Sequence, residues 1–167
     1  MKGWVREAFA KDNWKCIEQS VFNDIVEVLE KLYDKLPVQL IHRDVHLGNF
    51  LFDNGSFSGY IDFDLSQRNI RIFDLCYFVL GLLSEEEMLD VSEGRWFDIL
   101  RLFFKGYEQE CKLQLEEKRA VPYVMEAIEL LFAAWFVEQK DIKCAKNAVK
   151  IYKFVDKNKQ KILETIG

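Results

Sequence analysis

The chain has 167 residues, of which 50% are hydrophobic and 14% aromatic, with only 8 Gly and 2 Pro. This composition excludes intrinsic disorder and is enough to fill one domain, residues 1–167, around a substantial core. The formal net charge of −5 argues against a nucleic-acid-binding protein, which needs a basic surface to displace counterions from phosphates.

Cysteine spacing and apolar run length indicate the compartment. The four cysteines lie far apart without a C-x-x-C pair, which is typical of reduced core thiols and not of a zinc site or a disulfide framework. The longest apolar stretch, from Leu75 to Leu83, is shorter than the roughly 18 residues of a membrane span. Charged residues near the start interrupt any signal-peptide core. We therefore expect a cytoplasmic protein without a membrane or nucleic-acid partner.

The first half of the chain changes character at Pro37. Apolar residues at three- and four-residue spacing predict an amphipathic helix over 16–36, which Pro37 ends. Short apolar bursts separated by polar clusters follow over 38–64. The run Asp53-Asn54-Gly55-Ser56 predicts a hairpin turn between two short strands.

Helical periodicity returns after Asn69. It predicts helices over 72–83, 96–111, 122–137 and 142–163. Pro122 suits the first position of its helix, where a missing N–H costs nothing. The expected fold is a mainly helical α+β domain whose only sheet is a small hairpin over about Phe50 to Asp62.

Residues with chemical potential are concentrated between positions 42 and 64. The chain reads His42-Arg43-Asp44-Val45-His46-Leu47-Gly48-Asn49 and, after the predicted hairpin, Ile61-Asp62-Phe63-Asp64. The first run matches the phosphoryl-transfer pattern H-R-D-x-x-x-x-N, in which the Asp accepts the proton of the substrate hydroxyl and the Asn binds a metal ion. Asp62-Phe63 supplies the second metal-binding Asp that this pattern requires.

These residue types suit the transfer of a γ-phosphoryl group. The reaction gathers negative charge on phosphate oxygens, and Mg²⁺ neutralises that charge while preferring oxygen ligands such as Asn49 and Asp62. A hairpin between the two returns the chain, so both can bind one ion. Asp44 stays apart from the metal and faces the incoming hydroxyl. A lone loop Asp is usually a turn or cap residue, but the ordered set favours the chemical interpretation.

The same residues resemble the C-terminal lobe of the aminoglycoside phosphotransferase and choline kinase superfamily, small-molecule kinases related in fold to protein kinases. The shared pattern is H-x-D-x-H-x-x-N, then I-D-F-x, then an Asp-Leu pair at the start of a helix, here Asp74-Leu75. The resemblance implies that Asp44 is the catalytic base, that Asn49 and Asp62 bind Mg²⁺ with ATP, and that Asp74 supports the catalytic loop from below.

Other positions in the motif keep two interpretations. Asp64 either contacts the metal or closes the loop. His42 and His46 are more often hydrogen-bonded supports of a loop than proton carriers. Arg43 replaces the Gly that is common in these small-molecule kinases and resembles the protein-kinase form, although no A-P-E segment follows.

The resemblance covers only about the second half of the family's fold. No Gly-rich phosphate loop and no V-A-I-K strand occurs before His42. We therefore expect this chain to lack the nucleotide-binding N-terminal lobe, as a fragment of a longer kinase or as a natural truncation. Such a lobe should fold by itself, bind Mg-nucleotide weakly and not turn over ATP, and its exposed face should contact the missing lobe or a second copy.

The acceptor is expected to be a small molecule with a hydroxyl group. Acidic pockets suit cationic acceptors and aromatic pockets suit choline-like ones. Residues 84–93 contain five acids without a Lys or Arg, and aromatic residues follow on later helices, namely Trp96, Phe97, Phe103, Phe104, Tyr107, Trp135 and Phe136. A solvated helix start, with Ser84 capping Glu87, and ordinary core packing explain the same residues. The sequence does not choose an acceptor.

Two functions remain open on the sequence. One is the catalytic lobe of an ATP-dependent small-molecule phosphotransferase. The other is a non-catalytic remnant or binding module of the same fold. Asp44, Asn49 and Asp62 favour the first, because a module that only binds has no need of all three.

Overall fold

The computed structural model describes residues 3–84 and 92–167 and confirms a mainly helical α+β fold. In chain order the elements are α1 (Trp4–Lys11), α2 (Gln19–Tyr33), β1 (Val38–Ile41), the short 3-10 helix η1 (Leu47–Asn49), β2 (Phe50–Asp53), β3 (Ser56–Tyr60), β4 (Gln67–Ile70), α3 (Ile72–Ser84), α5 (Glu93–Glu110), α6 (Leu115–Glu138) and α7 (Ile142–Ile166).

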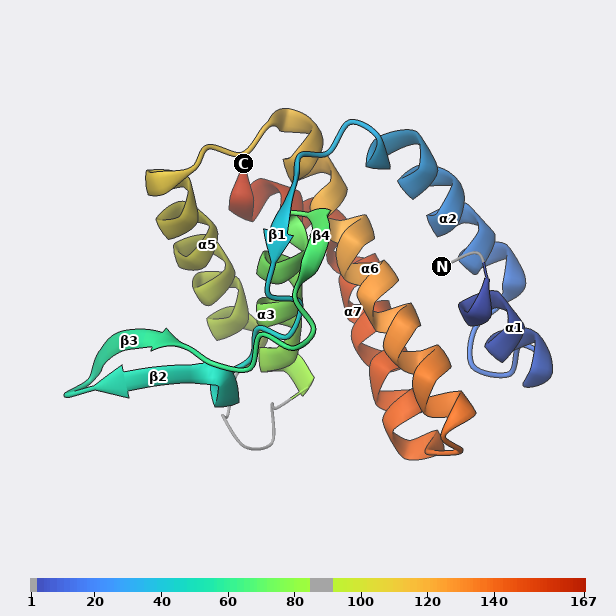
Figure 1. The fold of residues 1–167 in the computed structure, drawn as a ribbon. Coiled ribbons are helices and arrows are strands. Elements are labelled where there is room, and N and C mark those ends of the chain that lie inside the picture. The colour runs from blue at the N-terminus through green and yellow to red at the C-terminus, as the bar shows by residue number, and fades with distance from the viewer. Residues whose placement is uncertain (1–2, 85–91) are drawn as a thin grey trace.

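The long helices α6 and α7 pair along their length and form the centre of the molecule (Figure 1). Helices α3 and α5 pack on one side of this pair, and their contact is built around buried Trp96, Leu100 and Met125. Helices α1 and α2 pack on the other side, where Phe9 and Phe22 are fully buried. Burial of these large side chains is the main driving force for the fold.

Helix α6 is long and apolar enough to resemble a membrane-spanning helix. Its length and composition would allow it to cross a membrane, but 67% of the qualifying stretch is buried inside the protein. That burial is typical of the core helix of a globular domain, and it makes the membrane interpretation weak.

The start of α6 corrects one sequence prediction. The helix begins at Leu115, so Pro122 lies inside it and not at its first position. The Gln114 N–H donates to Oε2 of Glu117 at 2.8 Å, which satisfies one of the free donors at this end. Both Glu117 carboxylate oxygens also accept from Arg71, at 2.6 Å each. This buried ion pair fixes the start of the helix two turns before the proline.

The predicted helix over 16–36 is shorter than expected, since α2 runs from Gln19 to Tyr33, and α1 precedes it. Residues 16–18 are not helical. Ile17 fits the apolar spacing although it lies outside α2. Its side chain is buried among the apolar residues of α1 and α2. The apolar periodicity therefore predicted which residues are buried more accurately than it predicted where the helix begins.

The prediction of a single sheet is wrong, because the structure has two antiparallel strand pairs. β2 and β3 form the expected hairpin, which turns at Asn54 and Gly55, with φ of 48° and 79°. It ends at Tyr60 and not at Asp62. β1 pairs with β4, with Val38 opposite Ile70 and Ile41 opposite Gln67. β4 reads Gln-Arg-Asn-Ile, so it lacked the apolar alternation that predicts a strand.

Most of the aromatic residues considered for an acceptor pocket belong to the core. Trp96, Phe97 and Phe104 are buried in the core that α3, α5, α6 and α7 form, whereas Trp135 is 48% exposed. The acids Glu85, Glu86, Glu87 and Asp90, with the predicted cap on Glu87, lie outside the described residues. The fifth, Glu93, opens α5 after Ser92, whose side chain accepts from the Arg95 N–H at 3.4 Å.

Candidate active site

The loop between β1 and η1 is anchored to the first turn of α3. The His42 N–H donates to Oδ2 of Asp74 at 2.8 Å, and the Arg43 N–H donates to Oδ1 at 2.9 Å. One carboxylate thus holds two consecutive backbone amides of the loop. Charge-assisted hydrogen bonds of this kind are stronger than neutral ones, so they fix the loop relative to the helix.

His42 connects this loop to the far end of the hairpin. Its Nδ1 accepts from the Asp44 N–H at 3.3 Å, which assigns the proton to Nε2, and Nε2 lies 2.9 Å from the carbonyl oxygen of Ile61. The ring is buried and lies 4.5 Å from the ring of Phe63. His42 therefore holds the segment before Asp44 against the segment that leads into Asp62.

Two residues of the motif adopt a left-handed backbone conformation. Arg43 has a φ of 74° and Asp62 a φ of 64°. Side chains other than Gly are disfavoured there by about 1–2 kcal/mol, although Asp tolerates the conformation better than most residues. Strained residues of this kind cluster at functional sites, where the surrounding contacts keep them in place. Here the Asp74 and His42 contacts supply that restraint.

Two side chains hydrogen-bond the Asp44 carboxylate, and a third lies close to it. The Tyr77 hydroxyl donates to Oδ1 at 2.8 Å, and Asn49 Nδ2 lies 3.3 Å from Oδ2. The same Asn49 nitrogen also donates to the Asp44 carbonyl oxygen at 2.9 Å. His46 Nε2 lies 3.7 Å from Oδ2. The carboxylate is therefore oriented while remaining partly open to solvent.

The His46 ring is placed by the turn that follows it. Its Nδ1 accepts from the Gly48 N–H at 3.1 Å and caps η1, which leaves the proton on Nε2, facing Asp44. A Cβ atom at Gly48 would lie 2.8 Å from Cε1 of the His46 ring, closer than real Cβ atoms come. Only glycine at position 48 allows the ring to cap the turn in this position.

The predicted Mg²⁺ ligands lie at neighbouring points of the backbone. The Ile61 N–H donates to the Asn49 carbonyl oxygen at 3.1 Å, so the hairpin returns the chain next to its start. Both hydrogen bonds of the buried Asn49 amide use Nδ2, so Oδ1 remains available. The exposed Asp62 carboxylate has no hydrogen bond or ion pair within the described residues. These two oxygen donors fit Mg²⁺, which commonly binds one or two protein oxygens together with water and phosphate.

Asp64 lies in the exposed turn after Phe63 and has no hydrogen bond or ion pair with any residue that the structure describes. Across residues 3–84 and 92–167, no three His, Cys, Asp or Glu side chains are grouped closely enough to hold a metal ion by themselves. A metal at this site would therefore depend on the Asp62 carboxylate, on the Asn49 amide and on oxygens from a bound phosphate or water.

Two residues near the site were missed by sequence reasoning. Tyr77 lies three residues after Asp74, on the same face of α3, and this spacing was the available signal. Burial and the hydrogen bond to Asp44 raise the pKa of the Tyr77 hydroxyl, which therefore stays a donor. Glu129 lies on α6 in the middle of an apolar run, and it is 4% exposed. Tyr77 and Glu129 line the same cavity, together with His46.

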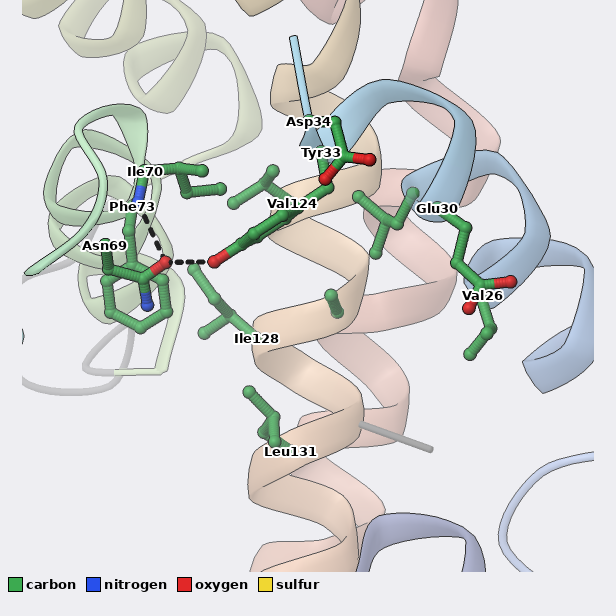
Figure 2. Close-up of a pocket in the computed structure, with 12 residues that line it drawn as sticks. Val26, Glu30, Tyr33, Asp34, Asn69, Ile70, Phe73, Val124, Ile128 and Leu131 are labelled. Carbon is green, nitrogen blue, oxygen red and sulfur yellow. Dashed lines mark hydrogen bonds between the residues drawn. The ribbon is translucent and has the colours of Figure 1, made fainter. Parts of the chain in front are cut away.

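A separate groove lies away from these residues, between α2, β4 and α6. Figure 2 shows its lining, where the Tyr33 hydroxyl donates to Oδ1 of Asn69 at 2.7 Å. The groove has a volume of about 670 Å³, and its walls are mainly apolar. None of the motif residues lines it, so it is not part of the candidate active site.

Several known proteins are similar in sequence to part of this chain. The model of the phosphotransferase enzyme family matches residues 1–120. A homoserine kinase of Zymomonas mobilis subsp. mobilis is 29% identical over 108 residues, covering 64% of this chain and 32% of the relative. A homoserine kinase of Neisseria meningitidis serogroup B is 29% identical over 106 residues, covering 63% and 33%. The chain spans about a third of the length of these relatives.

Two solved structures share the fold. The ethanolamine kinase of Plasmodium vivax superposes with a TM-score of 0.60 at 17% identity, over 91% of this chain and 47% of its own. An amicoumacin kinase, solved in complex with AMP-PNP, Ca²⁺ and a ligand abbreviated Ami, has a TM-score of 0.55 at 21% identity. The match covers 77% of this chain and 44% of that kinase. Each likeness covers less than half of the larger protein.

Proposed function

This chain belongs to the phosphotransferase enzyme family, and we propose that it forms the catalytic and acceptor-binding part of an ATP-dependent small-molecule kinase. The observation that carries the proposal is the environment of Asp44. Its carboxylate accepts from Tyr77 and lies beside Asn49, on a loop that Asp74 holds through two backbone amides. A base must be oriented in advance to help a hydroxyl attack, and this network provides that orientation.

In the proposed reaction Asp44 accepts the proton of the acceptor hydroxyl. A bond forms between the hydroxyl oxygen and the γ-phosphorus of ATP, and the bond from that phosphorus to the β–γ bridging oxygen breaks, so that ADP leaves with the electron pair. Asp44 contributes mainly by positioning the hydroxyl and by taking up its proton late. His46 Nε2–H, 3.7 Å from Asp44, faces the same carboxylate from the side of the following turn.

Asn49 and Asp62 are the proposed ligands of Mg²⁺, which when bound neutralises charge on the phosphate oxygens. The free Oδ1 of Asn49 and the unpaired carboxylate of Asp62 support this assignment. Asn49 also contacts Asp44, so one side chain sets the relation between the base and the metal ligands. Asp64, which is exposed beside them, is proposed as a further contact to the metal or its water shell.

Holding the nucleotide in the kinase fold requires sequence motifs that this chain does not contain. Catalysis by the kinase fold needs a glycine-rich cover and a Lys on the phosphates, and this sequence contains neither motif. We therefore propose that the 167-residue chain alone does not turn over ATP, and that it acts when joined to a nucleotide-binding lobe. That the matched part of this chain covers only about a third of each of these relatives supports this proposal.

The experiment compares the chain alone with the chain joined to a nucleotide-binding lobe. Transfer of labelled γ-phosphate to amine-bearing alcohols is measured for each, with Asp44→Asn as the matched variant. We expect transfer only from the joined protein, and its loss in Asp44→Asn. Equal transfer by Asp44→Asn, or a folded joined protein that binds Mg-ATP without transferring phosphate, would favour the non-catalytic alternative.

A further inference from the structure

Helix α7 carries seven lysines and only two acidic residues. Two of the lysines are ion-paired, Lys159 with Glu126 at 2.8 Å and Lys161 with Glu93 at 3.4 Å. The other five are exposed and repeat at alternating three- and four-residue spacing, which places them on one face of the helix, away from α6. We call this face the lysine stripe; it consists of Lys143, Lys146, Lys150, Lys153 and Lys157.

The lysine stripe is unfavourable for the helix by itself. Like charges three or four residues apart repel one another, and Lys143 and Lys146 lie at the N-terminal end of α7, where the helix dipole is already positive. Lys146 and Lys153 make no hydrogen bond or ion pair with any residue that the structure describes. A helix face that is only solvated typically mixes charges of both signs, so this unmixed positive face points to an anionic partner.

A groove lies beside the stripe, between the first half of α7 and the connection from α1 to α2. It has a volume of about 700 Å³. Lys15 lines it from the connection, three lysines of the stripe line it from α7, and Ile142 and Val149 supply apolar surface. Among the described residues, Asp12 is the only acid in the lining. The groove therefore combines an apolar floor with positive charge from two elements.

We propose that this groove binds an acidic amphipathic helix of a partner protein. The acidic residues of that helix, spaced three and four residues apart, pair with the lysine stripe, as charged residues do between the helices of a coiled coil. Its apolar residues cover Ile142 and Val149. The inference does not depend on the proposed phosphoryl transfer, because the groove and the cavity beside Asp44 have no described lining residue in common.

The charges around the stripe favour a short helix over a longer polyanion. From Lys143 to Lys157 the stripe extends for about 21 Å, or about four helical turns. Glu138 and Asp141 lie just before its start, and Glu164 lies on the same helix beyond its end. A nucleic acid or an anionic bilayer extends past these acids and is repelled by them. All seven basic residues of α7 are Lys, whereas the planar fork of Arg is the better fit to phosphate groups.

The test is fluorescence anisotropy of this chain with a labelled synthetic peptide of about 18 residues, long enough to span the stripe as a helix. The peptide has Glu at alternating three- and four-residue spacing and Leu between, and its uncharged control has Gln in place of every Glu. The groove variant removes three lysines that line the groove, by Lys15→Gln, Lys146→Gln and Lys153→Gln. The matched control variant removes three exposed lysines elsewhere, by Lys31→Gln, Lys35→Gln and Lys105→Gln.

We expect wild type to bind the Glu peptide with an affinity that falls as salt is raised, because exposed charges are screened. The groove variant should bind it about tenfold more weakly, a factor that corresponds to about 1.4 kcal/mol shared among three exposed ion pairs. The control variant should bind it as wild type does, and the Gln peptide should bind to none of the three proteins.

Several outcomes would overturn the assignment. These are no binding of the Glu peptide by wild type, equal binding of the Gln peptide, or an equal loss of affinity in the groove and control variants. Tighter binding of a single-stranded RNA of similar length, or of phosphatidylserine vesicles, would assign the stripe to a different class of partner and overturn the acidic helix. Circular dichroism checks that each variant folds, and if the groove variant does not, Lys146→Gln and Lys153→Gln are compared singly with Lys105→Gln.

Discussion

The Tyr77 hydroxyl donates a 2.8 Å hydrogen bond to Oδ1 of Asp44, and it comes from the same helix face that holds the loop through Asp74. Asp74 lies in the first turn of α3, and Tyr77 lies three residues later, almost directly above it. One helix thus positions both the backbone of the loop and the side chain of Asp44, the proposed base. The position of Asp44 therefore depends on α3 as well as on the loop's own contacts through His42 and Asn49.

Replacing Tyr77 with Phe should lower turnover of the joined protein by about tenfold to a hundredfold, because a hydrogen bond to a charged group is worth about 1.5–3 kcal/mol. The KM for ATP should stay near the wild-type value, since the metal ligands are untouched. Steady-state kinetics measure both. Tyr33→Phe is the matched control, because it removes one tyrosine hydrogen bond, to Asn69, outside the site. If Tyr33→Phe lowers turnover as much as Tyr77→Phe or more, the loss reflects reduced stability of the protein and not the contact with Asp44.

Asp44→Asn and Asp62→Ala should separate proton acceptance from metal binding in the joined protein. Asp44→Asn should reduce turnover strongly while Mg-ATP affinity stays unchanged, because the proposed metal ligands remain. Asp62→Ala should weaken both, because a hard oxygen ligand is lost. Calorimetry with Mg-ATP and a phosphate-transfer assay give the two readouts. Small and equal losses of turnover in both variants would support a binding module without catalysis.

The sequence was sufficient to locate the motif and the main helices. His42, Asp44, Asn49 and Asp62 stand at fixed spacing, and the Asn54-Gly55 turn is strongly determined by local backbone preferences. These features could be predicted because each depends on neighbouring residues. The pairing of β1 with β4 could not, since it joins segments more than twenty residues apart, and the polar side chains of β4 carry no strand pattern.

The contacts that the site residues make could not be predicted from the sequence either. Glu129 has the same chemical type as Glu117 and Glu126 on one helix, and only packing decides which of them meets a basic residue. Pro122 gave a misleading signal for a similar reason. The contact of Glu117 with Arg71 starts the helix earlier, and local propensity yields to that buried ion pair.

The hairpin should promote self-association of the isolated chain. It projects away from the helices (Figure 1), and Phe52 and Phe57 are 59% and 51% exposed. Exposed aromatic side chains grouped on one element favour association, because contact removes apolar surface from water. Sedimentation velocity over a range of concentrations should show a larger species that Phe52→Ser with Phe57→Ser reduces. A monomer at every concentration would contradict this prediction.

Arg71→Leu should destabilise the fold by about 3–5 kcal/mol, because it leaves the fully buried Glu117 carboxylate without its partner. The Arg71 side chain is 12% exposed, and it also donates to the Lys112 carbonyl oxygen at 2.8 Å, so the loop before α6 should loosen as well. Denaturant unfolding measures the free energy. The double variant Arg71→Leu with Glu117→Leu should recover much of the loss, since no charge is then buried alone. A double variant no more stable than the single one would show that the hydrogen bonds, and not the unpaired charge, dominate.

Glu129 should make the stability of the chain fall as pH rises. In the unfolded chain its pKa is near the ordinary 4.5, and burial raises it to about 8 in the folded protein. Between these values the folded protein holds a proton that the unfolded chain has released, so the free energy of unfolding decreases with pH and levels off above about 8. Burial also raises the pKa of Glu126, to about 7, so this residue adds a slope of the same sign. Unfolding of wild type and Glu129→Gln from pH 5 to 9 isolates the Glu129 contribution. The difference between them should grow by a few kcal/mol in favour of the variant, because one pKa unit corresponds to about 1.4 kcal/mol. A constant difference across this range would show that Glu129 is not buried unpaired in solution.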